Sequence, residues 1–336
     1  MNKIAKTVLM TGTALCAAGV VLSTAGYFAG GKDFTYTSDH MYVSGGNSSS
    51  RKNLTVMKKE QIDDFTKLNV DFENFDLDIR TSDDDHYYME YKLEKNGRKN
   101  PLTWKDKDGE LTLEESAGGS GSYYITYDLG IFSTHADLTE KKDALNTVIL
   151  YIPEKAQLSE AELQLSDGDL TADQLLCKEM TLELLNGDLM LDKGEFEKFD
   201  AKLSDGDLNV KELQCTDNMQ LKSGNGDVTI KKAELADGQI ALSDGDLQID
   251  NGSFNGDMKI NSSCGDVSVE MKNGSVEKTN IYLKAADGDV DTEGLSRGKS
   301  DNEEDTSVYE NKAGASAPTL NVKCSDGDIT LTESEK

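Results

Sequence analysis

The sequence predicts an all-β protein built as a single-stranded β-helix, or β-solenoid, with coils of about 19–20 residues. Three observations predict it. A Gly-Asp dipeptide recurs at a nearly constant spacing, and apolar residues occupy alternate positions around each copy. The hydrophobic content of 36% is also low for a compact core, but it suits the thin interior of an elongated fold.

The repeat is defined by the position of its glycine. Gly-Asp begins at Gly168, Gly187, Gly206, Gly226, Gly245, Gly265, Gly288 and Gly327, with spacings of 19, 19, 20, 19, 20, 23 and 39 residues. The last spacing is about two periods and contains a polar segment, 296–318, which we interpret as a loop inserted into one repeat. One further Gly-Asp, at Gly256, is out of phase.

Mostly apolar residues recur five and three positions before the glycine and two and four positions after it. The position nine after the glycine is apolar in the first five repeats: Cys177, Phe196, Cys215, Leu235 and Phe254. In the column two after the glycine the residues are Leu170, Leu189, Leu208, Val228, Leu247, Val267, Val290 and Ile329. Alternation of this kind indicates strands with one buried face, separated by a turn at the glycine. Coils stacked ~4.8 Å apart would bury these faces together. A β-sandwich also has alternating strands, but it has no reason to repeat them in register.

The predicted organisation has four parts: a membrane anchor or signal segment at 1–31, a polar linker at 32–55, an N-terminal cap with irregular coils at 56–145, and the regular solenoid at 146–336. Within the third part, 68–79 alternates as a strand–turn–strand, and 56–65 is expected to hold a short capping helix, because a bare end coil would expose pairing edges. Residues 148–152 are expected to form a strand closed by Pro153.

The first segment contains Lys3 and Lys6, followed by an uncharged stretch from Thr7 to Gly30. These twenty-four residues, at ~1.5 Å each, are long enough to cross a bilayer as a transmembrane helix. The basic end would stay in the cytoplasm, which places the bulk of the chain outside the cell membrane. The alternative is a signal peptide cleaved near Ala25, which would release the protein. A lipoprotein is less favoured, because Leu15 before Cys16 makes a poor lipobox.

The repeat aspartates are the candidate metal site. They should stack along one edge of the solenoid as a row of carboxylates: Asp169, Asp188, Asp207, Asp227, Asp246, Asp266, Asp289 and Asp328. Unit charges ~5 Å apart repel by about 0.8 kcal/mol in water, so something must offset the row. Either turn amides donate hydrogen bonds to the carboxylates, or the row binds Ca²⁺. The column before the glycine alternates Asp with Asn in its first five members, which favours the amides.

The cysteines outside the first segment are expected to be free. Cys177 and Cys215 share a column two coils apart, beyond disulfide reach, and Cys264 and Cys324 fall in different columns. His40, His86 and His135 have no partner at the spacing of a zinc site or a catalytic triad. We therefore predict no catalytic residues and no cofactor. The net charge of −28 argues against nucleic acid as a partner.

The Ser-Asp-Gly-Asp-Leu repeats at 166–170, 204–208 and 243–247, the strand 148–153 and the N-terminal apolar segment resemble a bacterial family. It is the putative-adhesin domain family of β-strand repeat proteins, which includes LiaG-like envelope proteins of Gram-positive bacteria. The resemblance covers roughly 65–335 and implies a β-helical, non-enzymatic module exposed in the cell envelope.

We therefore expect a membrane-tethered, extracytoplasmic binding or scaffold module whose partner is an envelope protein or a glycan. Recognition would fall to the irregular loops at 114–142 and 296–318, because loops on a rigid scaffold usually carry binding. Two alternatives stay open: an enzyme acting on polysaccharide, and a regulatory partner of an envelope-stress sensor.

Overall fold

The computed structural model describes residues 34–36, 41–43, 54–117, 125–126, 145–292, 295, 298–303 and 306–335. The chain divides into two compact units. The first comprises 1–54, 95–99 and 117–144, and the second comprises 55–94, 100–116 and 145–336.

The described strands of the first unit form a three-stranded antiparallel sheet. Strand β1 (Phe34–Tyr36) pairs with β2 (Met41–Val43) and with β9 (Ile125–Thr126). The segment expected to be a polar linker, 32–55, therefore contains two short strands. Of the irregular loop expected at 114–142, residues 118–124 and 127–142, with His135, lie outside the described residues, as does His40.

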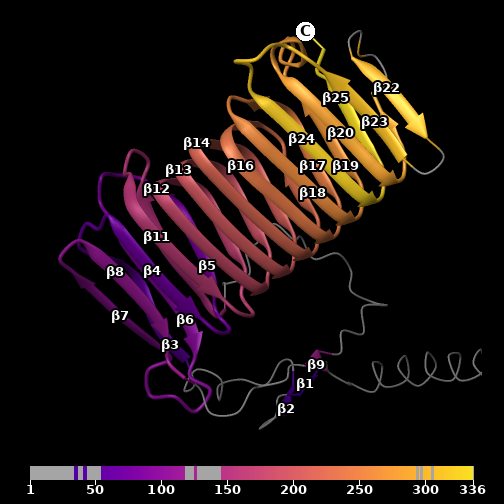
Figure 1. Ribbon diagram of the computed structural model, residues 1–336. Coiled ribbons are helices and arrows are strands. Elements are labelled where there is room, and N and C mark those ends of the chain that lie inside the picture. The colour runs from indigo at the N-terminus through magenta and orange to yellow at the C-terminus, as the bar shows by residue number, and fades with distance from the viewer. Residues whose placement is uncertain are drawn as a thin grey trace, which may run out of the picture. The chain divides into compact units, whose positions relative to one another are not determined.

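The second unit is a β-solenoid (Figure 1). Its N-terminal strands are β3 (Leu54–Gln61), β4 (Lys67–Phe72), β5 (Asp76–Ser82), β6 (Tyr88–Glu94), β7 (Leu102–Lys107), β8 (Glu110–Glu115), β10 (Thr147–Pro153) and β11 (Leu158–Leu165). The central coils contain β12 (Leu170–Asn186), β13 (Leu189–Asp205), β14 (Leu208–Asn225), β15 (Val228–Ile230), β16 (Ala233–Asp244), β17 (Leu247–Phe254), β18 (Asp257–Cys264) and β19 (Val267–Met271). At the C-terminal end are the 3₁₀ turn η2 (Val276–Lys278) and strands β20 (Asn280–Asp287), β21 (Val290–Asp291), β22 (Lys299–Glu303), β23 (Thr306–Asn311), β24 (Thr319–Asp326) and β25 (Ile329–Glu333).

Successive coils pair in parallel and in the register that the repeat predicts. Leu170 lies opposite Leu189, Leu189 opposite Leu208, and Leu208 opposite Val228. Each long strand, such as β12 or β13, runs from one Asp-Gly or Asn-Gly corner to the next and supplies the whole coil. The second unit is therefore an all-β solenoid, as the periodicity indicates.

The interior is formed by the predicted columns. Residues three before the repeat glycines are all buried, including the polar Ser223 and Ser262, and so are those five before. The column nine after the glycine also turns inward, with Cys177, Phe196, Cys215, Leu235 and Phe254 at 0–3% exposure. This third column closes the coil, because two strand faces alone would leave one side of the interior open to water.

The N-terminal end differs from the expected cap. Segment 54–61 is the strand β3, which pairs with β6, so the prediction of a capping helix at 56–65 is wrong. The free edges of the end coil are covered by strand pairing instead: β6 lies antiparallel to β10, and β7 antiparallel to β8. The strands predicted over 68–79 and 148–152 are confirmed as β4, β5 and β10.

At the C-terminal end the coils do not follow sequence order. Strand β24 pairs in parallel with both β18 and β20, and β25 pairs with both β19 and β21. The last coil of the sequence is thus inserted between the two coils that precede it (Figure 1). The segment interpreted as a loop, 296–318, contains β22 and β23, which pair antiparallel with each other. Strand β23 also pairs antiparallel with β20. The loop prediction is wrong there, because the edge of β20 needs a pairing partner.

The predicted membrane segment at 1–31 lies outside the described residues. Within the described ranges, no helix is long and apolar enough to cross a bilayer.

Candidate functional site

At the corner of the solenoid, the glycines of successive coils stack in close backbone contact. A Cβ added at Gly206, Gly226 or Gly245 would lie 2.2 Å from the carbonyl oxygen of the glycine in the preceding coil. Gly245 also has a φ of +121°, which side chains rarely adopt. Only glycine fits this corner, so the regular spacing of glycine in the sequence is a steric requirement of the stack.

The repeat aspartates form the expected row, and backbone amides bind it. In each coil one carboxylate oxygen accepts a hydrogen bond from the backbone N–H of the corresponding aspartate in the neighbouring coil. From Asp76 the donors are, in spatial order, the amides of Asp169, Asp188, Asp207, Asp227, Asp246, Asp266, Asp328 and Asp289, at 2.8–3.0 Å. We call these nine residues the aspartate ladder.

The ladder satisfies a backbone group that the turn leaves over. The glycine amide and the amide two residues after it reach carbonyls of the adjacent coil, as Gly226 and Val228 do to Asp244 and Asp246. The aspartate amide between them points to the preceding coil, where the carboxylate takes the place of a carbonyl. Such charge-assisted bonds offset the repulsion along the row.

Two positions of the ladder depart from the sequence-based expectation. Asp328 lies between Asp266 and Asp289, because the last coil is inserted there. The row also begins at Asp76, in the Asn-Phe-Asp turn of the first coil. Burial raises the pKa of Asp76, while its hydrogen bond from Asp169 opposes the rise.

In the column before the glycine, hydrogen bonds between adjacent coils explain why Asp alternates with Asn. The Asn186 Nδ2 donates to Asp167 Oδ1 at 2.7 Å, and the Asn225 Nδ2 donates to Asp205 Oδ1 at 2.6 Å. Each asparagine thus neutralises the contact that two carboxylates would make. Among the described residues, no group of three or more His, Cys, Asp and Glu side chains is arranged to hold a metal ion.

The four cysteines that the structure describes are free, and three of them are buried interior residues. Cys177 and Cys215 both stack against Phe196, two coils apart. Burial raises the pKa of Cys177 to about 12 and also raises the pKa of Cys215 and Cys324. Cys264 is exposed, in the column before the glycine, between Asp244 and Asp326.

His86, the described histidine, lies on an exposed turn, where its backbone N–H donates to Asp84 Oδ1. Nearby, Lys59 Nζ lies 3.7 Å from the ring centroid of Tyr151, whose hydroxyl donates to Glu90 Oε1. These charged and aromatic groups are matched within the cluster, so they stabilise the N-terminal strands.

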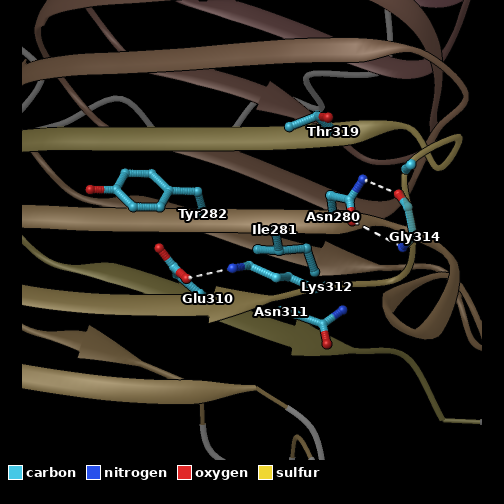
Figure 2. A pocket seen from close by; sticks show the side chains of 9 residues that line it. Asn280, Ile281, Tyr282, Glu310, Asn311, Lys312, Gly314 and Thr319 are labelled. Atoms are coloured by element: carbon cyan, nitrogen blue, oxygen red, sulfur yellow. Dashed lines mark hydrogen bonds and ion pairs between the residues drawn. The ribbon is translucent and has the colours of Figure 1, made fainter.

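A hollow that the repeat pattern did not predict lies on the outer side of the C-terminal coils (Figure 2). It has a volume of ≈ 450 Å³, which is in the range of ligand pockets, roughly 300–1,000 Å³. Its lining is Asn280, Ile281, Tyr282, Glu310, Asn311, Lys312, Gly314, Ala315 and Thr319. The pairing of β20 with β23 and β24 brings these residues together, and no linear motif marks that pairing.

Asn280 holds the wall of the hollow in place. Its Oδ1 accepts the amides of Ala313 and Gly314, and its Nδ2 donates to the carbonyls of Gly314 and Ala317. Figure 2 shows Tyr282 further along the same strand, with Glu310 on the neighbouring strand, where it pairs with Lys312 at 3.7 Å.

The sequence matches a known family over most of its length: residues 65–332 match the family described as Toastrack DUF4097. The chain belongs to the Toastrack family. This assignment confirms the resemblance to putative-adhesin β-strand repeat proteins inferred from the Ser-Asp-Gly-Asp-Leu repeats.

Several crystal structures are similar to this Toastrack chain. A putative adhesin from Parabacteroides merdae is 16% identical, with 84% of this chain and 97% of that chain covered at a TM-score of 0.48. A putative adhesin from Parabacteroides distasonis is also 16% identical, with 84% of this chain and 97% of that chain covered at a TM-score of 0.45. A putative lipid binding protein from Parabacteroides distasonis is 11% identical, with 85% of this chain and 98% of that chain covered at a TM-score of 0.45. No curated protein matches the sequence.

Proposed function

We propose that this Toastrack protein is a non-enzymatic binding or scaffold module of the cell envelope, tethered to the outer side of the membrane by residues 1–31. The observation that supports it is the use of the ladder carboxylates. Each ladder aspartate from Asp76 to Asp328 commits one oxygen to the neighbouring coil. The ladder carboxylates therefore join neighbouring coils into a rigid surface, which is the property that a binding or scaffold module needs.

The tether is tested by fractionating cells that carry the full chain with a C-terminal tag. A retained anchor predicts a membrane-bound tag that external protease removes from intact spheroplasts. Amino-terminal sequencing of the isolated protein separates an anchor from cleavage near Ala25. Recovery of the tag in the cytosol would contradict the proposal.

Binding is tested by chemical crosslinking in the native envelope, followed by identification of what is joined to the chain. A defined envelope protein or glycan is the expected result, and a membrane-embedded stress sensor would identify the module as a regulator. A hydrolysis screen on envelope polysaccharides tests the alternative, that the protein is an enzyme. Sustained product formation that depends on an exposed carboxylate would make the protein an enzyme.

A further inference from the structure

The outer face of the solenoid changes its charge pairing from one end to the other. On the earlier coils, three lysines of this face pair with glutamates of the adjacent coil: Lys67 with Glu160, Lys198 with Glu179, and Lys202 with Glu183. Lys222, which lies opposite Lys202, is an exception, with no ion pair among the described residues. On β18, β24 and β20 the outward positions hold Asp257, Lys259, Asn261, Thr319, Asn321, Lys323, Asn280, Tyr282 and Lys284. These positions hold three lysines and one aspartate, and Asp287 and Asp326 lie at the ends of the strands, in a chain of net charge −28.

Two of these lysines are direct neighbours. Lys284 of β20 lies opposite Lys323 of β24 in the parallel register, and neither has an ion-pair partner among the residues that the structure describes. Like charges placed opposite each other on adjacent strands destabilise a sheet. An anion bound between the two ammonium groups would remove that repulsion.

The lysine pair continues into the hollow. Tyr282 precedes Lys284 by two residues, so both side chains lie on the outer face, ~7 Å apart along the strand. Tyr282 is partly exposed, and its hydroxyl has no partner within the described ranges. The floor beside it is the buried Ile281, and the wall is the loop held by Asn280 (Figure 2).

We propose that Tyr282, the hollow beside it and the pair Lys284 and Lys323 form one binding site for an anionic glycan. The ring of Tyr282 offers an apolar face to the C–H groups of a sugar ring, and its hydroxyl offers a hydrogen bond. The two ammonium groups bind a carboxylate or phosphate on the next unit of the chain. This inference rests on the proposed binding function and names its ligand class.

The acids around the site are either paired or set apart from the two lysines. Glu310 lies opposite Tyr282 in the register of β20 and β23, and its carboxylate is paired with Lys312 at 3.7 Å. Asp287 and Asp326 follow Lys284 and Lys323 by three residues, or ~10 Å along the strands. This separation exceeds the Debye length of about 8 Å at physiological ionic strength. A nucleic acid is disfavoured, because a long polyanion would extend over the ladder and the other acidic surfaces of the chain.

The test uses the full chain in detergent micelles and four probes: oligogalacturonate, phosphomannan, neutral dextran and single-stranded oligo-dT. Carboxylated and phosphorylated glycans distinguish the two sources of the anion. We expect one or both to bind with an affinity that falls as salt rises, and dextran and oligo-dT to bind at least tenfold more weakly. Equal or tighter binding of oligo-dT, or no binding of either anionic glycan, would overturn the proposal.

The matched variants carry the same change of charge at two places on one face. K284Q/K323Q should weaken the anionic glycan at least tenfold, whereas K198Q/K202Q, which removes lysines already paired with glutamates, should change affinity less than twofold. Y282A should weaken binding and Y282F should restore most of it. Equal effects of the two lysine pairs would mean general charge attraction and would refute the site.

The failure of this site and the failure of the proposed function are separable. If K284Q/K323Q still crosslinks to the same envelope component as the unchanged protein, the glycan site is refuted and the binding module stands. If neither protein crosslinks to any envelope component while the glycan probes still bind, the site stands and the envelope function is refuted.

Discussion

At each corner of the solenoid, glycine and aspartate have separate roles. Glycine lets two backbones approach where no Cβ fits, and aspartate supplies the acceptor for an amide that the turn leaves over. The two residues recur together because each coil meets its neighbour at the same place. Their roles can be separated by substitution.

Gly245→Ala should destabilise the protein by roughly 3 kcal/mol or more, because its Cβ would lie 2.2 Å from the Gly226 carbonyl oxygen at a φ of +121°. Gly274→Ala is the control: its φ is +75°, but nothing lies within 4 Å of the added Cβ. It should cost about 1–2 kcal/mol, from backbone strain alone. Urea unfolding measures both, and equal losses would contradict the steric argument.

Asp207→Ala removes the acceptor of the Asp227 amide and should cost about 1 kcal/mol. Asp207→Asn keeps a carbonyl acceptor and removes one repelling charge, so its unfolding free energy should stay within about 0.5 kcal/mol of the unchanged protein. If the asparagine variant is as unstable as the alanine variant, then the charge itself is needed, and the structural account of the ladder is wrong.

Cys177 should resist alkylation by iodoacetamide in the native protein, while the exposed Cys264 reacts. The pKa of Cys177 is raised from 9.0 to about 12, so the folded thiol stays protonated where the unfolded one ionises. The stability that this difference contributes is complete below pH 9 and is lost as the pH rises toward 12. Mass spectrometry of labelled peptides at pH 8 and pH 10 checks it; rapid native labelling of Cys177 would contradict the burial.

At the scale of elements, insertion of strands protects both ends of the solenoid. Strand β5 lies between β10 and β12, and β24 lies between β18 and β20, so neither is an end strand. The outer edges are occupied by antiparallel partners, β6 at one end and β23 at the other. Exposed edges recruit other chains, and these antiparallel partners cover the edges of β10 and β20.

Truncation before Thr319 should therefore disrupt more than the residues it removes. It deletes β24 and β25, which would leave β18 and β20 without their shared partner. We expect limited proteolysis to cut 272–318 rapidly while 158–256 stays protected. Removal of 335–336 alone is the control and should leave the pattern unchanged. A truncated chain with full protection of 280–291 would show that β20 does not depend on the insertion.

At the scale of the whole molecule, the acidic surface is organised by its own backbone. The net charge of −28 favours solubility, and in the solenoid the ladder carboxylates are held by amides. Each ladder carboxylate from Asp76 to Asp328 has one oxygen committed to a neighbouring amide, whereas Ca²⁺ takes 6–8 oxygen ligands.

Ca²⁺ should therefore stabilise the full chain no more than Mg²⁺ does at equal ionic strength, because both ions only screen the row. Thermal unfolding in EDTA, Mg²⁺ and Ca²⁺ measures this, with a Tm difference between the two ions below about 2 °C, or roughly 0.5 kcal/mol. A large rise specific to Ca²⁺ that Asp207→Asn abolishes would establish a calcium ladder in its place.

The repeat alone was enough to predict the solenoid, the inward columns and the row of aspartates, because a period of identical residues must produce identical neighbours. It also predicted free cysteines, since Cys177 and Cys215 fall two coils apart. The order of the last coils could not be read in this way, because Val322 pairs equally well with Ile260 or Leu283 and the chain makes both pairings. Strand β3 was missed because its character comes from an edge partner distant in sequence.

The hollow beside Tyr282 and the unmatched pair Lys284 and Lys323 belong to the same class of feature. They arise only when 280–287, 306–311 and 319–326 come together in space. Periodicity is a local property that a chain records along its length, whereas a surface made by strand insertion depends on which edges remain free after the coils have stacked.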